Sequence, residues 1–206
     1  MSIVLYHHPY SRAANMIWAL EEVGAPYTLR TVNLLAGEHK SPELLALNTM
    51  GKLPVITDGD AVVSETSAIC MYLADRYALG RLSPALDDRE RGAYLRWCVY
   101  PSAVIEPGCM AKGAGWAYKP SQAGWGSYES IVQTLDTALK NGPWLLGDRF
   151  TMADVLVGSS LRWMLRFKMI DAVDSFVAYA ERLAARPALQ ASEAKNAAVM
   201  KELGLG

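Results

Sequence analysis

Two features in the first third of the chain could together bind a short acidic peptide. Pro54 starts an apolar segment after Leu53, and because proline lacks an N–H it belongs at the first residue or the edge of a strand. The Leu53–Pro54 bond can be cis, which would leave the N–H and C=O of Leu53 free to pair with an extended peptide. Glu65 and Thr66 then begin a helix, whose first N–H groups and dipole favour a carboxylate. The plain alternative is a hairpin that starts with proline, followed by an ordinary helix cap.

The elements that must position these residues alternate between strand and helix. Apolar runs, helical spacing and Gly or Pro stops predict strand 3–7, helix 12–23, strand 27–32, a short helix 42–47, a hairpin turning at 58–60 and a helix from 64. A strand–helix–strand unit implies parallel strands with a right-handed crossover, and the hairpin adds an antiparallel pair. We therefore expect an α/β domain with a mixed four-stranded sheet over residues 1–80.

The pattern becomes helical after Gly80. Residues 81–86 are expected to form a linker, and residues 87–206 an all-α domain. Its predicted helices are 87–111 with a bend near Pro101, 128–139, 151–168, 173–185 and 187–203.

The strongest helix start in this half lies at Thr151. Thr151 as N-cap and Asp154 at N3 form a capping box, with Phe150 and Val155 at the hydrophobic-staple positions. This pattern indicates a role in folding rather than in chemistry. Three tryptophans of this half are assigned to the core: Trp97, Trp144 and Trp163.

The composition excludes several classes of protein. The 206 residues are 51% hydrophobic and carry a net charge of -1, which argues against nucleic acid or an anionic membrane as main partner. No apolar run suits a membrane span, and the N-terminus lacks the signature of a signal peptide, so a cytoplasmic location is expected. The three cysteines and three histidines lack the spacing of a disulfide framework or a metal site.

The motifs in this order resemble the cytosolic glutathione S-transferases over nearly the whole chain. Residues 51–55, GKLPV, look like the family's loop into a cis-proline. Residues 65–69, ETSAI, resemble its Glu-Ser-x-Ala-Ile helix start, and residues 151–154 its helical-domain folding motif. The resemblance implies an N-terminal thioredoxin-like domain, a C-terminal helical bundle, a detoxifying transferase activity, glutathione as co-substrate, no metal and a homodimer.

The resemblance also assigns the residues that hold glutathione. Leu53, before Pro54, would pair its backbone with the cysteinyl part, while Glu65 and Thr66 would hold the γ-glutamyl end. Thr66 replaces the usual serine and keeps its hydroxyl. The remaining ligands implied for the carboxylates of the peptide are His39, Lys40 and Lys52.

The thiol-activating hydroxyl has two candidates under the same resemblance. Ser11, followed by Arg12 at a helix start, looks like the serine of theta-type and related bacterial members. Tyr6, at the end of the first strand, looks like the tyrosine of the alpha, mu and pi classes. Ser11 is favoured, although it could be no more than an N-cap, and Tyr6 no more than a packed strand residue.

The acceptor for the thiolate is expected to be a small hydrophobic electrophile, bound between the domains. The residues assigned to its pocket by position are Tyr10, Tyr100, Met110, Trp116 and Tyr118. Packing inside the helical domain is the competing explanation for each of them.

Two other functions remain open at this point. Glutathione-dependent reduction, dehalogenation or isomerisation is one, but a reductase usually carries a cysteine near the first helix, and none lies between Met1 and Ile69. The other is a carrier with the same fold that binds hydrophobic ligands without turnover.

Overall fold

The computed structural model describes residues 2–205, which form two compact units. The first unit contains the residues up to Ala78 together with those from Arg186 onward, and the second contains Leu79–Ala185. The first unit is therefore discontinuous in sequence. Residues 187–203 were expected to belong to the helical domain, whereas the structure groups that segment with the sheet.

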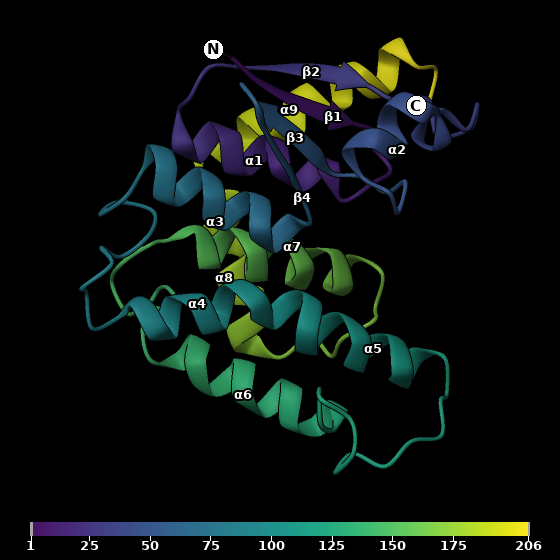
Figure 1. The fold of residues 1–206 in the computed structure, drawn as a ribbon. Helices are drawn as coiled ribbons and strands as arrows, with labels where there is room; N and C mark the ends of the chain where they lie inside the picture. Colours follow the sequence, from purple (N-terminus) through teal and green to yellow (C-terminus); the bar gives the residue numbers. More distant parts are fainter. Residues whose placement is uncertain (1, 206) are drawn as a thin grey trace. The chain divides into compact units, whose positions relative to one another are not determined.

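The sheet of the first unit has four strands in the order β2-β1-β3-β4 (Figure 1). The strands are β1 (Ile3–His7), β2 (Tyr27–Thr31), β3 (Val55–Asp58) and β4 (Ala61–Ser64). β1 pairs parallel with β2 and antiparallel with β3, which pairs antiparallel with β4. These pairings confirm the predicted mixed sheet. The crossover between β1 and β2 and the tight β3–β4 hairpin leave few other arrangements of the four strands.

Helices pack on both faces of this sheet. α1 (Ala13–Val23) and α3 (Thr66–Tyr77) contact each other, and α1 also packs on β1. On the other face, short α2 (Pro42–Leu47) places Leu44 in a cluster with Tyr6, Val32 and Val55. A 3-10 turn, η1 (Glu38–Lys40), precedes α2. The period of two along β1 explains this division, because Leu5 and Tyr6 point to opposite faces.

The last helix, α9 (Pro187–Glu202), packs against α1, and its yellow ribbon runs beside the purple α1 in Figure 1. Polar contacts hold it there. The guanidinium of Arg186 donates to both carboxylate oxygens of Glu22, at 2.6 and 2.7 Å. The amide of Asn196 accepts from Nε2 of buried His7 at 2.8 Å and donates to the Ala14 carbonyl. Burial lowers the pKa of His7, so its ring stays neutral near pH 7.

The second unit consists of helices α4 (Arg91–Tyr100), α5 (Glu106–Gly113), α6 (Tyr128–Lys140), α7 (Met152–Arg166) and α8 (Asp174–Ala184). The helix expected over 87–111 is interrupted, since residues Pro101–Ile105 form a π-helical segment between α4 and α5. Pro101 cannot donate to the preceding turn, so the ladder of hydrogen bonds is displaced at the predicted bend.

α7 is the most buried helix of this unit, and its start has the predicted capping box. The Asp154 carboxylate accepts from the N–H groups of Thr151 and Leu145 and from the Tyr179 hydroxyl, each at 2.9 Å. Of the tryptophans assigned to the core, Trp97 is buried and Trp144 half-buried. The assignment of Trp163 is wrong, because its side chain is 50% exposed and packs on exposed Phe167.

No helix within residues 2–205 combines the length and the apolar character needed to cross a membrane.

Candidate functional site

Ser11 lies in the loop between β1 and α1. Its hydroxyl donates to the His8 carbonyl at 2.8 Å and accepts from the Ala13 N–H at 3.2 Å. The residue at the N-cap is Arg12, one position later than expected, although Ser11 still accepts from the first N–H of the helix. The side chain is half-buried, so the hydroxyl stands at a positive helix end with access to solvent.

Tyr6 has a different environment. Tyr6 is 7% exposed and lies in the cluster between the sheet and α2, where Leu53 also packs. The Arg30 guanidinium lies over this ring, 5.3 Å from its centre. Ser11 and Tyr6 are therefore held by different parts of the unit, Ser11 by the loop that starts α1 and Tyr6 by the α2 face of the sheet.

The Leu53–Pro54 peptide bond is cis. Neither the N–H nor the C=O of Leu53 has a hydrogen-bond partner in the described part of the chain. The Asn48 side chain holds the loop that leads to Leu53. Its amide donates to the Lys52 carbonyl at 2.9 Å and accepts from the Met50 N–H at 3.1 Å. An extended peptide can thus pair with the Leu53 backbone on a preformed edge.

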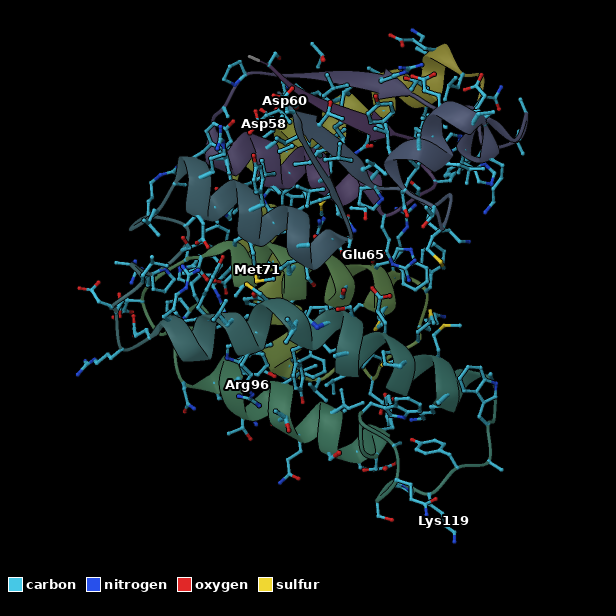
Figure 2. The ribbon with its side chains drawn as sticks, viewed as in Figure 1. Asp58, Asp60, Glu65, Met71, Arg96 and Lys119 are labelled. Atoms are coloured by element: carbon cyan, nitrogen blue, oxygen red, sulfur yellow. The ribbon has the colours of Figure 1, made fainter. Side chains whose placement is uncertain are left out.

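Glu65 adopts an unusual backbone conformation at the start of α3. Its φ of 71° and ψ of 128° lie outside the regions that L-residues normally populate. Such a conformation costs about 1–3 kcal/mol and is typical of binding sites. The Glu65 side chain is exposed and makes no capping hydrogen bond to residues 2–205 (Figure 2). The Glu65 carboxylate is therefore not used in capping α3 within the described residues and is accessible to solvent.

Cationic side chains border the Leu53 loop. The Lys40 ammonium donates to the Met50 carbonyl at 2.8 Å, and Lys52 is exposed. Gly51 permits this approach, because a Cβ there would lie 2.8 Å from the Lys40 ammonium, and its φ is +57°. His39 is half-buried, and its Nδ1 has no hydrogen-bond partner within residues 2–205. This border favours an anionic ligand.

A polar anchor that the sequence did not reveal fixes the hairpin to α3. Buried Asp58 accepts from the hydroxyls of Tyr72 at 2.8 Å and Tyr77 at 2.5 Å, and pairs with Arg76 at 3.0 Å. The hydrogen bonds and the cation outweigh burial and lower the pKa of Asp58. This anchor lies at the other end of the hairpin from Glu65 and ties the last residue of β3 to α3 (Figure 2).

The residues assigned to the acceptor pocket belong to both units. Tyr10, in the first, is 63% exposed and donates to the Leu205 carbonyl at 2.6 Å. In the second unit Met110 and Trp116 are exposed, while Tyr118 packs on Trp125. Tyr100 packs edge-on against Trp97, at 5.0 Å between ring centres. Tyr100 and Tyr118 thus have aromatic neighbours of their own.

Residues 2–205 contain no group of three or more His, Cys, Asp or Glu side chains that could hold a metal ion. In the first unit, Leu53 offers a backbone N–H and C=O that have no partner among residues 2–205, Glu65 offers a carboxylate, and Ser11 offers a hydroxyl.

Two models of known protein domains match this chain. Residues 1–75 match the model of the glutathione S-transferase N-terminal domain, and residues 118–191 that of its C-terminal domain. Glutathione S-transferase 3 of Zea mays is 30% identical over 202 residues, which is 90% of each chain. Human glutathione S-transferase theta-2 is 52% identical over 54 residues, 26% of this chain and 22% of that one.

A similar solved structure is a glutathione transferase family member from Pseudomonas fluorescens Pf-5 with two glutathione molecules bound. Its TM-score is 0.76 at 25% identity, with 93% of this chain and 92% of that chain covered. Together with the two domain matches and the maize relative, this structure shows that the chain belongs to the glutathione S-transferase family.

Proposed function

We propose that the protein transfers the thiolate of glutathione to small hydrophobic electrophiles, with Ser11 as the hydroxyl that stabilises the thiolate. The observation that carries the proposal is the unpaired backbone of Leu53 beside the cis-proline, which suits the cysteinyl part of an extended glutathione. Glu65 and Thr66 would hold the γ-glutamyl end. Lys40, with His39 and Lys52, would hold the glycyl carboxylate.

The hydroxyl acts by favouring the thiolate over the thiol. A hydrogen bond to a charged group contributes roughly 1.5–3 kcal/mol, and each 1.36 kcal/mol lowers the thiol pKa by about one unit. A thiol pKa of about 8.5 would thus fall close to neutrality, and the N-terminus of α1 acts in the same direction. The thiolate then attacks the electrophilic carbon and displaces its leaving group, so no protein nucleophile or histidine base is needed.

Two observations support Ser11 over Tyr6. The Ser11 hydroxyl donates to a backbone carbonyl in a half-buried loop, so a rotation about χ1 can redirect it to a sulfur. The Tyr6 ring is enclosed by Val32, Leu44 and Val55. We therefore assign thiolate stabilisation to Ser11 and packing to Tyr6.

Replacing Ser11 and replacing Glu65 should separate chemistry from binding. Ser11→Ala removes only the proposed donor, so kcat with an aryl halide should fall roughly 10- to 100-fold while the dissociation constant of glutathione changes little.

Glu65→Ala should weaken glutathione binding roughly 10-fold or more in calorimetry, because the ligand ammonium loses its carboxylate.

Tyr6→Phe is the matched control for the hydroxyl, since it keeps the ring in its cluster. Full turnover in this variant together with loss in Ser11→Ala supports the assignment, whereas the reverse pattern moves the role to Tyr6. Unaltered glutathione affinity in Glu65→Ala would contradict the site itself. Activity across a panel of electrophiles, beside ligand displacement, distinguishes a transferase from a carrier or from another glutathione-dependent enzyme.

We further propose that the protein works as a cytoplasmic homodimer, as its family resemblance implies. Sedimentation equilibrium should then give about twice the chain mass of 22.5 kDa at micromolar concentration. A single species of 22.5 kDa at all concentrations would refute the dimer without affecting the assignment of Ser11.

A further inference from the structure

The turn that carries Ser11 from β1 into α1 is built on His8. The Ser11 N–H donates to the His8 carbonyl at 3.0 Å, and the Ser11 hydroxyl donates to the same oxygen at 2.8 Å. The Tyr10 N–H donates to Nδ1 of the His8 ring at 3.1 Å. His8 therefore accepts three hydrogen bonds from this turn, two through its backbone and one through its side chain.

The sequence explains why the turn uses a side-chain acceptor. Pro9 follows His8 and suits the second position of a tight turn, because its ring fixes φ and brings no N–H. The Tyr10 N–H comes next and has no other acceptor among residues 2–205. Asn and Asp commonly fill this role by bonding the backbone two residues further on. Here the imidazole of His8 takes their place.

The His8 ring must be neutral for this role, with its proton on Nε2. A protonated Nδ1 would direct a hydrogen at the Tyr10 N–H and could not accept from it. His8 is 4% exposed, and burial lowers the pKa of its imidazole. The imidazole of His7, next to it on the chain, is neutral for the same reason. Nδ1 of His8 is therefore available as an acceptor near pH 7.

Tyr10 is held in this turn at three places. Its N–H bonds the His8 ring, its own ring lies tilted against that ring with 5.8 Å between the centres, and its hydroxyl donates to the Leu205 carbonyl at 2.6 Å. All of these residues belong to the first unit. The residue before Ser11 is thus fixed, which leaves rotation about χ1 as the main freedom of the Ser11 hydroxyl.

We propose that His8 is a positioning residue for thiolate stabilisation, and that its ring holds the turn from which the Ser11 hydroxyl reaches the glutathione sulfur. The inference rests on the proposed role of Ser11. When the hydroxyl turns from the His8 carbonyl to the sulfur, the Ser11 N–H still bonds that carbonyl, and the Tyr10 N–H still bonds the ring. The hydroxyl can therefore change partners without loosening the turn.

The test measures the pKa of the glutathione thiol in the complex, through the ultraviolet absorbance of the thiolate, and kcat with an aryl halide. His8→Leu fills the space of the ring but cannot accept, so the thiol pKa should rise by about one unit and kcat should fall roughly 10-fold. The dissociation constant of S-methylglutathione, which has no thiol, should stay unchanged. His8→Asn should restore the thiol pKa and kcat, because its Oδ1 can accept from the Tyr10 N–H.

His7→Gln is the matched control, since it changes the adjacent buried histidine and keeps a donor for Asn196, which His7 bonds through Nε2. Its thiol pKa should equal that of the wild type. An unchanged thiol pKa in His8→Leu, or no recovery in His8→Asn, would overturn the proposal. The imidazole nitrogen shifts of the wild type, measured by NMR, test it without any variant. A protonated Nδ1 of His8 near pH 7 would also overturn it.

Ser11→Ala separates this inference from the proposed function. The thiol pKa should rise in Ser11→Ala, and adding His8→Leu should raise it no further, because His8 acts through Ser11. A further rise in the double variant would overturn the inference alone. A wild-type thiol pKa in Ser11→Ala would instead refute the role of Ser11, and the role of His8 with it.

Discussion

Asp154→Ala is expected to lower the free energy of unfolding by roughly 3–5 kcal/mol. The carboxylate is fully buried and accepts from the Thr151 and Leu145 N–H groups and from the Tyr179 hydroxyl. Alanine would leave the buried Thr151 and Leu145 N–H groups without this acceptor, take the 2.9 Å bond from the Tyr179 hydroxyl and remove the capping box of α7. Each such loss costs about 1–3 kcal/mol. Urea denaturation followed by circular dichroism measures the change.

Ser127→Ala serves as the control for this prediction. Ser127 forms the corresponding capping box with Ser130 at the start of α6, on an exposed surface. Its replacement should cost only about 1 kcal/mol. Equal losses in the two variants would show that burial of Asp154 adds nothing to the cap.

Asp154 also predicts a dependence of stability on pH. Burial raises the pKa of its carboxyl to about 6, although the hydrogen bonds that it accepts oppose the shift. A pKa raised in the folded state gives a contribution that is complete below the unfolded pKa of about 4 and is lost as the pH rises through 6. Relative to Asp154→Asn, the wild type should lose roughly 2–3 kcal/mol between pH 4 and pH 7. A constant difference between the two proteins would mean that the carboxyl ionises normally when folded.

Glu22→Ala is expected to destabilise the first unit by roughly 3 kcal/mol. Glu22 is buried and accepts both bonds from Arg186 and a third, at 2.9 Å, from the indole N–H of Trp18. Its removal takes this carboxylate away from the Arg186 guanidinium. Removing one partner of a fully buried ion pair typically costs about 3–5 kcal/mol. The cost is lower here, because the Arg186 side chain is 26% exposed. Urea denaturation followed by tryptophan fluorescence monitors the transition.

Glu21 provides the comparison within the same helix. It pairs with Lys195 of α9 at 2.5 Å, but the lysine side chain is 45% exposed. Glu21→Ala should therefore change stability by no more than about 1 kcal/mol. A loss as large as that of Glu22→Ala would show that the number of contacts to α9, rather than burial of the pair, determines stability.

The sheet could be predicted from sequence because its signals are local. The apolar run at Ile3–His7 and the tight turn at Asp58-Gly59-Asp60 fix strands and register over a few residues. The capping box at Thr151 is equally local, and the structure confirms it. The resemblance to the family, in turn, predicted the class of protein to which the comparisons assign the chain.

Features that depend on distant residues were missed. Nothing near Asp58 signals that Tyr72 and Tyr77 will donate to it, and nothing in residues 187–203 signals that this helix packs on α1. The spacing of its apolar residues predicts a helix but not its neighbour. Trp163 was assigned to the core because of its residue type, whereas its position on α7 places it on the exposed side.

The packing of α9 on α1 has a consequence for synthesis on the ribosome. The sheet and its first helices are complete at Ala78, but the segment that covers α1 begins only at Arg186, after the whole second unit. At usual rates of translation the nascent first unit waits on the order of ten seconds with part of α1 uncovered. A fragment cut at the end of the N-terminal match would remain in that incomplete state, so a stable version of the first unit needs α9 joined back to it.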